Sequence, residues 1–470
     1  MKMPHLLSKR TLVPVSVLLA LLTSGCLSVG PDYQSPTTEI APGYKGADAR
    51  LGNRVERRWW RAFGDSTLNN YMSDLESGNF DLKGALARRN QALAALGIDR
   101  AELFPQVSAS GGVTRSRGSN SDITAGIGGN YLTRYSVSAS LGYEIDLWGR
   151  VRRLVEAGTA DAEAASLTVE DVRLSLQSQL ARSYFALRFL DNDAHVLRQA
   201  MGTREESLSL AQDRFEGGTT SELDVARAET ELASTKAQLV ALEGPRASLE
   251  NAIAVLAGKH PSNFSISASY YDRSIPEIDS GLPGDLLGRR PDVAARERQL
   301  AATSARIGVA TAEFFPKISL TGSGGRSAIS STDFLNWSSR AFAIGPEVSV
   351  PLFQGGRLTS NLDLAKAEQE EALAAFQQSA LNAFADVENA LASLSAARNE
   401  VAALEASVKA ADKTYKLSNL QYQEGVTSFL DVVDSQREQL NAERRKVEAR
   451  GRQFGATVQL IQALGGGFTR

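Results

Sequence analysis

The sequence is poor in the residues that most often build active sites and disulfides. Among 470 residues it contains one cysteine, Cys26, and three histidines, His5, His195 and His260. A single cysteine excludes an intrachain disulfide, and histidines so widely spaced do not indicate a metal site. His195 falls within a helical pattern and is best explained as a structural residue. No phosphate loop and no nucleophile beside a base occurs, so we expect no enzyme activity, no metal and no cofactor.

Two further absences concern partners and membranes. The formal net charge is only −3, so the chain lacks the basic excess typical of nucleic-acid-binding proteins. After residue 25 there is no run of about 18 apolar residues, which excludes a later transmembrane helix. A mature chain that spans a membrane would therefore have to do so with β-strands.

The first 25 residues are typical of a secretory signal, with a basic start, an apolar segment at 12–22 and small residues before Cys26. A lone cysteine at this place is either a leftover thiol or the lipidated N-terminus of a bacterial lipoprotein. LTSGC resembles a lipobox, although Thr23 stands where leucine is commoner. We therefore expect a covalent lipid on Cys26. In bacterial lipoproteins an aspartate directly after the lipidated cysteine usually signals retention in the inner membrane. Leucine stands there in this chain, so by resemblance we expect sorting to the outer membrane.

The chain repeats itself. QDRFEGGTTSELDVARAE at 212–229 returns as LQYQEGVTSFLDVVDSQ at 420–436, with matching residues 207 positions apart. AELFPQVSASGG at 101–112 likewise returns as AEFFPKISLTGSGG at 312–325. Because the order is the same in both halves and the unit is far too long for a solenoid, the chain is a duplicated domain.

Each half predicts one very long helix and two shorter ones. Apolar residues at spacings of three and four, without proline, predict helices over 150–216 and 357–422, each about 100 Å long at 1.5 Å per residue. We expect the two short helices of each half to stack end to end beside the long one, and Gly244-Pro245 to kink or break its helix. The short helices are expected at 81–104, 221–257, 292–315 and 428–464.

Period-two alternation of apolar and polar residues predicts strands at 135–147, 317–321 and 342–352. Each half then offers one hairpin, within about 105–147 and 316–352. A soluble sheet packed on one face is one explanation, and membrane strands are the other. Four strands cannot close a membrane barrel, so two, three or four chains would have to combine.

Both helical hairpins turn at glycines, near 217–221 and 424–428. Gly217, Gly218 and Gly425 can end a helix with a positive φ. Ser221-x-x-Asp224 and Ser428-x-x-Asp431 then indicate the start of the next helix, with an acidic residue near its positive end.

Several longer motifs match a known family. They are VGPDYQSP, WWRAFGDSTLNNYM, YEIDLWGRVR, RRPDVAARERQLAATSARIGVATAEFFPKISLTG and the C-terminal ALGGGF. The chain thereby resembles outer-membrane factors of the NodT/OprM type, the lipoprotein relatives of TolC. The resemblance implies a mostly α fold with membrane β. It implies a homotrimer with a 12-stranded barrel in the bacterial outer membrane and a 12-helix tunnel in the periplasm.

The resemblance also implies a function and partners. The chain would be the exit duct of a tripartite efflux pump for drugs or other small solutes. A periplasmic adaptor would join it to an inner-membrane transporter, usually of the resistance-nodulation-division class. A duct for protein export and a passive porin or structural lipoprotein are the alternatives. A porin does not need about 100 Å of helix, and the lipobox and GPDY favour the efflux group by resemblance.

The resemblance and the repeats together divide the chain. The expected parts are a signal peptide (1–25), a lipid-anchored segment of the equatorial collar (26–64), repeat 1 (65–258), an equatorial linker (259–290), repeat 2 (291–464) and a tail (465–470).

Two groups of site residues follow from the resemblance. Leu430, Asp434 and Arg437 share one helix face just past the second turn, and in the family that face lines the tunnel where it closes. A ring of leucines would narrow this aperture, and the carboxylates would repel one another unless water, a cation or Arg437 screened them. The alternative for Asp434 is an ordinary solvated helix face.

The second group is the hairpin lock. Tyr422, Asp224 and Asp431 match positions that hold neighbouring hairpins together in relatives. Thr427 and Leu223 depart from the family pattern, and simple helix capping is the alternative for both aspartates. The turn glycines Gly217, Gly218 and Gly425 are expected to dock the adaptor, with capping alone as the alternative.

Overall fold

The computed structural model describes residues 28–37, 43–45, 55–119, 131–279 and 283–469. Cys26 and the expected signal lie outside the described residues. The chain forms two compact units. The first contains 1–36, 89–165 and 296–376, and the second contains 37–88, 166–295 and 377–470.

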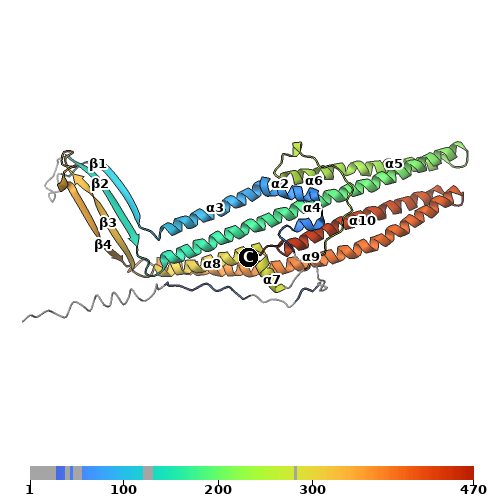
Figure 1. Ribbon diagram of the computed structural model, residues 1–470. Helices are drawn as coiled ribbons and strands as arrows, with labels where there is room; N and C mark the ends of the chain where they lie inside the picture. Colours follow the sequence, from blue (N-terminus) through green and yellow to red (C-terminus); the bar gives the residue numbers. More distant parts are fainter. Residues whose placement is uncertain (1–27, 38–42, 46–54, 120–130, 280–282, 470) are drawn as a thin grey trace, which may run out of the picture. The chain divides into compact units, whose positions relative to one another are not determined.

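The helices and strands follow the duplicated order expected from the sequence (Figure 1). They are η1 (Trp59–Phe63), α2 (Ser66–Gly78), α3 (Phe80–Ala101), β1 (Gln106–Arg117), β2 (Tyr131–Glu144), α4 (Arg150–Glu216), α5 (Glu222–Ala241), α6 (Glu243–Leu256), η3 (Pro261–Asn263), α7 (Pro283–Arg289), α8 (Pro291–Ala312), β3 (Lys317–Ala328), η4 (Trp337–Ser339), β4 (Arg340–Ser349), α9 (Arg357–Gln423) and α10 (Phe429–Ala463). In the part of the chain that is described, no helix is both long and apolar enough to cross a lipid bilayer.

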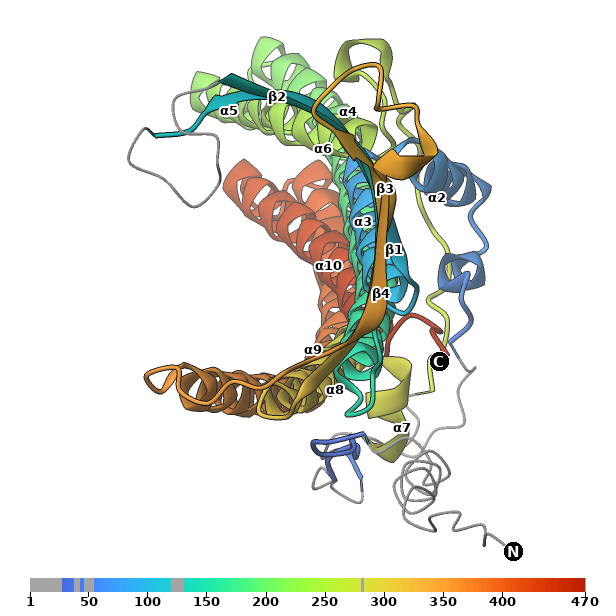
Figure 2. The same cartoon turned by 90° about the vertical axis from the view of Figure 1, so that its left-hand side faces the viewer.

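The first unit carries one antiparallel sheet with strand order β1-β2-β3-β4. Each expected hairpin is present, and β2 also pairs with β3, so the two copies of the repeat share one sheet. Figure 2 shows that this sheet is curved. Apolar side chains such as Val107, Phe342 and Ile344 are largely exposed on it, so this chain alone does not cover them.

β2 and β4 each end three residues earlier than the alternation predicts, because the chain turns toward the next helix, whereas β3 continues to Ala328, beyond the expected 317–321. Ile145 and Leu147 lie beyond β2, although they continue its pattern. Between them, Asp146 accepts hydrogen bonds from the backbone N–H groups of Val151 and Arg152 at 3.1 and 2.9 Å, and thereby satisfies the start of α4. A residue that caps a helix cannot also continue a flat strand.

A segment that we call the N-terminal strap, residues 28–36, packs on the first unit. The Val29 N–H donates to the Trp148 carbonyl at 3.0 Å. Gly30 crosses the helix backbone so closely that a Cβ on it would lie 2.4 Å from the Cα of Gly308. Asp32 forms a 2.6 Å ion pair with Arg153, whose side chain is only 6% exposed. The strap therefore holds the chain just after Cys26 against α4 and α8.

The second unit has an aromatic core. Phe185 of α4 lies between Phe63 of η1 and Phe454 of α10, with ring centroids 4.8 and 4.9 Å away. Phe454 also contacts Phe189 at 5.2 Å. These rings are buried and join segments from both repeats, so burial of their area stabilises the unit as a whole.

The short helices meet end to end in the second unit, as expected. Asn79, just before α3, donates its side-chain N–H to the carbonyl of Leu256 at the end of α6, at 3.0 Å. In the other half, Arg290 before α8 reaches the carbonyl of Ala463 at the end of α10, at 3.5 Å.

The helix break expected near Gly244-Pro245 lies slightly earlier. α5 ends at Ala241 and α6 begins at Glu243, so Leu242 is the junction. Pro245 then stands in the first turn of α6, where a missing N–H costs no helical hydrogen bond.

Candidate functional site

The two hairpin turns have the same backbone hydrogen bonds. At the first turn, the N–H groups of Gly218 and Thr219 donate to the carbonyls of Phe215 and Arg214, both at 2.9 Å. At the second, Gly425 and Val426 donate to Tyr422 and Gln421 at 3.0 and 2.8 Å. Gly218 and Gly425 have φ values of +70° and +77°, as this type of helix end requires. The expected glycine stops are therefore present, while Gly217 does not have a positive φ.

The two helix starts after the turns differ. Ser428 and Asp431 form a reciprocal capping box at the start of α10. Asp431 also accepts a hydrogen bond from Thr427 at 2.5 Å, and these side-chain hydrogen bonds lower its pKa. At α5 the side chain of Ser221 makes no capping hydrogen bond. Asp224 instead accepts from Thr220 at 2.5 Å.

A small apolar core joins the tips of the two hairpins. It brings together side chains from α4, α5, α9 and α10, and Tyr422 and Phe429 contact each other with ring centroids 5.3 Å apart. The buried members are Ala211, Ala228, Tyr422, Phe429, Val432 and Val433. The two hairpins of one chain are thus packed together at the end where both turn.

Arg214 fastens one hairpin to the other. From the end of α4, its guanidinium donates to the carbonyls of Tyr422 and Gln423 at 2.9 and 2.8 Å. The same group lies 4.5 Å from the centroid of the Tyr422 ring. The Tyr422 carbonyl also accepts from the Gly425 N–H in the turn, so Arg214 adds a second donor at the end of α9, supplied by the other hairpin.

The three residues expected to form the hairpin lock are not hydrogen-bonded to one another. The Tyr422 hydroxyl is buried and has no partner among the described residues. Asp224 pairs with Arg227 at 3.3 Å, and Asp431 serves the capping box. The hairpins of this chain are instead joined by Arg214, while the role of the three residues between chains stays a prediction.

Arg437 is anchored by a buried carboxylate. Its Nε and Nη2 donate to the same oxygen of Glu231 at 2.9 and 2.5 Å, and these bonds raise the pKa of Arg437. Glu231 also pairs with Arg204 of α4 at 3.3 Å. The side chains of Glu231 and Arg204 are 8% and 4% exposed, whereas half of Arg437 is open to solvent. One buried acid therefore holds two arginines from different helices.

The other two residues expected at the aperture are also exposed. Leu430 is 42% exposed, and the Asp434 side chain is 61% exposed. Asp434 lies 3.5 Å from Arg437, so its charge is partly compensated on its own helix. The structure thus places Leu430, Asp434 and Arg437 close together on α10, and all three are at least partly exposed to solvent.

The residues around Leu430 line a groove built from duplicated positions. The groove lies between α5 and α10 and has a volume of about 220 Å³. Leu223 and Leu430 line it, as do Thr230 and Arg437, and each pair is 207 positions apart. The two repeats therefore present corresponding faces, but only the second carries a cation at the last position.

Sequence reasoning missed Glu231, Arg204 and Arg214. The sequence gives no local signal for Glu231, although the structure buries it together with Ala228 and Thr235 of α5. Nothing in the sequence indicated the positions that Arg204 and Arg214 contact, which lie on other helices.

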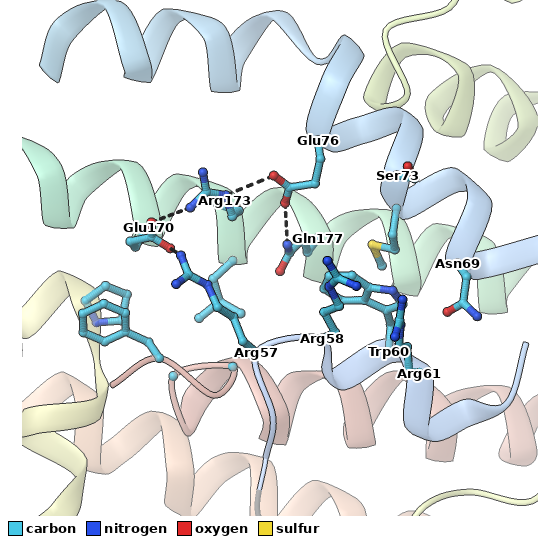
Figure 3. Close-up of a pocket in the computed structure, with 16 residues that line it drawn as sticks. Arg57, Arg58, Trp60, Arg61, Asn69, Ser73, Glu76, Glu170, Arg173 and Gln177 are labelled. Carbon is cyan, nitrogen blue, oxygen red and sulfur yellow. Dashed lines mark hydrogen bonds and ion pairs between the residues drawn. The ribbon is translucent and has the colours of Figure 1, made fainter. Parts of the chain in front are cut away.

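A larger pocket of about 560 Å³ lies beside η1 in the second unit (Figure 3). Arg57 pairs with Glu170 at 2.8 Å, and Arg173 connects Glu170 to Glu76 at 2.5 and 3.1 Å. Gln177 adds a hydrogen bond to Glu76 at 2.7 Å. These contacts connect the segment before η1, and α2, to α4. The charged residues of this pocket therefore have a structural role. Across the described ranges no cluster of side chains could hold a metal ion.

Comparison with known proteins identifies relatives. Residues 71–259 and 282–466 match the family described as outer membrane efflux protein. OprJ, an outer membrane protein of Pseudomonas aeruginosa, is 31% identical over 382 residues, or 80% of each chain. SilC, a probable outer membrane lipoprotein of Salmonella typhimurium, is 26% identical over 384 residues, which is 80% of this chain and 82% of SilC.

A solved structure supports the same relationship. The outer-membrane channel OprN superposes with a TM-score of 0.87 and 32% identity, covering 94% of this chain and 99% of OprN. The two matched family segments coincide with the two halves of the chain. These likenesses confirm the expected fold class, which is mostly helical with a small antiparallel sheet built from a duplicated unit.

Proposed function

Because the chain belongs to the outer membrane efflux protein family, we propose that three copies of it form one gated duct for drugs or other small solutes. The outer membrane is its location and efflux is its process. Each copy contributes four strands to a closed membrane sheet and its helical hairpins to a periplasmic tunnel. A periplasmic adaptor and an inner-membrane transporter, of the resistance-nodulation-division class, complete the pump.

The observation that best supports a gate is the arrangement of charged side chains around Glu231. This buried carboxylate fixes Arg437, and Arg437 in turn neighbours the exposed Asp434. Three copies around an axis would place three leucines and three carboxylates at one narrow level. A narrow ring of apolar side chains excludes water from a pore, and a ring of charged side chains selects ions. In this proposal the apolar ring keeps the duct closed until the adaptor binds.

Two finer assignments belong to the same proposal. Cys26 carries a covalent lipid that anchors the chain, which the lipobox and the lipoprotein relative SilC support. The exposed turns at Gly218 and Gly425 dock the adaptor, since three copies would present six similar turns at one end. The chain performs no catalysis in this proposal.

Conductance tests the gate. Replacing Leu430 and Asp434 together by alanine should raise single-channel conductance in planar bilayers and sensitise cells to large antibiotics. The matched control replaces another exposed leucine and carboxylate, Leu417 and Glu405 of α9, by alanine. Equal conductance of wild type, double variant and control would place the constriction elsewhere.

A further inference from the structure

A second cavity of about 560 Å³ lies in the first unit, where the strands end and the helices begin. Its walls come from the end of β2 and the start of α4, from the segment between α8 and β3, and from the segment between β4 and α9. The cavity is large enough for a small polar ligand or a lipid headgroup. No sequence motif indicated it.

Most charged groups on the cavity wall are already paired. Glu144 is 2.8 Å from both Arg150 and Lys317, so these three side chains form one network. Asp146 pairs with Arg152 at 3.2 Å, in addition to capping α4. These groups have little charge left to offer to a ligand.

Two lining residues of opposite charge remain without an ion pair among the described residues. Glu313 has one carboxylate oxygen buried with no hydrogen-bond partner. The guanidinium of Arg357, an exposed residue, donates to the neutral side chain of Gln354. An uncompensated carboxylate and an uncompensated guanidinium in one cavity match a ligand that carries both an ammonium group and a phosphate.

The surroundings favour a lipid over a soluble zwitterion. Trp148 is on the cavity wall, stacked on Phe315 at 4.8 Å, and its Nε1 donates to the carbonyl of Pro316 at 2.8 Å. Tryptophan with an apolar face and one satisfied polar atom is typical of the membrane–water interface. The Trp148 carbonyl also binds Val29 of the strap, three residues after Cys26. An acylated Cys26 would place the membrane surface beside the cavity.

We propose that this cavity binds the headgroup of phosphatidylethanolamine, with its ammonium group against Glu313 and its phosphate against Arg357. The choice of a lipid rests on the proposed membrane location and anchor, whereas the pairing with Glu313 and Arg357 rests on the cavity alone. Bound lipid would compensate both charges and fix the junction between sheet and helices.

Native mass spectrometry of the full-length protein, released from detergent with defined lipids, tests the proposal. Wild type should retain phosphatidylethanolamine in preference to phosphatidylglycerol. Glu313→Gln should weaken retention of phosphatidylethanolamine about tenfold without weakening phosphatidylglycerol, because only the ammonium loses its partner. Arg357→Gln should weaken both lipids. The controls are Glu371→Gln and Lys366→Gln, exposed positions on the same helix, α9.

Three results would overturn the proposal. The first is equal retention of both lipids by wild type, and the second is unchanged phosphatidylethanolamine retention by Glu313→Gln. The third is binding of soluble phosphoethanolamine with no lipid retained, which would assign the cavity to a solute. Single-channel conductance of the same samples is measured separately. Failure of the proposed duct would appear in the conductance, and failure of the proposed lipid site would appear in lipid retention.

Discussion

The charged partners of Glu231 are two arginines from different helices. It lies between the guanidinium groups of Arg204 and Arg437, and only 8% of its side chain is exposed. Burial by itself lowers the pKa of Arg204, so the nearby carboxylate is what keeps a buried cation tolerable there. We therefore expect Glu231 to position the proposed aperture through Arg437, in addition to its structural role.

Glu231→Gln should destabilise the protein by about 3 kcal/mol, because removing one member of a buried ion pair leaves an uncompensated charge. It should also raise single-channel conductance, since Arg437 loses its anchor. Thermal unfolding in detergent and bilayer recordings measure the two effects. Glu438→Gln is the matched control, because Glu438 occupies the corresponding position of the second repeat and is exposed. Equal effects of the two substitutions would contradict the assigned role.

Asp431 gives a pH dependence with a definite sign. Hydrogen bonds from Thr427 and Ser428 lower its pKa, so its contribution to stability is complete above the ordinary aspartate pKa of about 3.9. The contribution is lost as pH falls through the lower, folded-state value. Asp431→Asn should therefore lower the unfolding midpoint at pH 7, and the difference from wild type should shrink as pH falls below the ordinary aspartate pKa.

The duplicated position supplies the control for this measurement. Asp224→Asn removes a carboxylate from a turn whose serine makes no capping hydrogen bond, so its effect should be smaller. A difference between wild type and Asp431→Asn that did not shrink as pH fell below the ordinary aspartate pKa of about 3.9 would rule out the capping explanation.

At the scale of the element, the two turn glycines have a conformational role that can be tested separately from a role in docking the adaptor. Both glycines have positive φ, yet no atom lies within 4 Å of the position that a Cβ would take at Gly218 or Gly425. Asparagine tolerates this left-handed conformation, whereas β-branched residues do not. An asparagine in place of Gly218 or Gly425 should therefore keep the turn conformation while adding a side chain.

Gly425→Asn and Gly218→Asn should abolish efflux while the trimer still assembles, if the turns dock the adaptor. The reason is steric, because each substitution adds a side chain to an exposed contact surface and keeps the helix cap. Drug-resistance assays and native gel electrophoresis measure the two outcomes. Wild-type resistance in both variants would leave capping as the only role of these glycines.

The end-to-end helix contacts show how elements are positioned by single residues. Asn79 both accepts a hydrogen bond from the Leu82 N–H at the start of α3 and donates to the last turn of α6. One side chain thus caps one helix and aligns the next. The paired short helices can then cover a long helix without being continuous with each other.

At the scale of the whole molecule, the sheet of the described residues has four strands and leaves many apolar side chains exposed. We expect a detergent-resistant homotrimer, and light scattering corrected for bound detergent measures it. Three copies supply twelve strands, enough to close a membrane sheet that four strands leave open. A monodisperse monomer would exclude the proposed duct.

Cys26→Ser should abolish labelling with fatty acid while the sheet still inserts into the membrane, because the strands rather than one lipid hold the protein there. Mass spectrometry of the mature N-terminus and membrane fractionation are the measurements. A mature N-terminus other than a modified Cys26 would contradict the lipid assignment.

The sequence by itself determined the features that depend on neighbouring residues. The lengths of α4 and α9, the glycine stops and the duplication all follow from spacing along the chain, because helix periodicity and turn conformation are local properties. The strands were also detectable, but their ends were not. Asp146 continues the alternation of β2 and yet caps α4, and a local pattern does not decide between two such uses.

Only the tertiary structure decided which distant charges meet. Glu231 binds Arg437 across 206 positions, and Arg214 binds the carbonyl of Tyr422 across 208. Neither pairing has a local signal, because an arginine has the same helix propensity whether it faces water or a buried acid. The folding of two repeats against each other selected these partners, and the residues at duplicated positions differ, as Thr230 and Arg437 show.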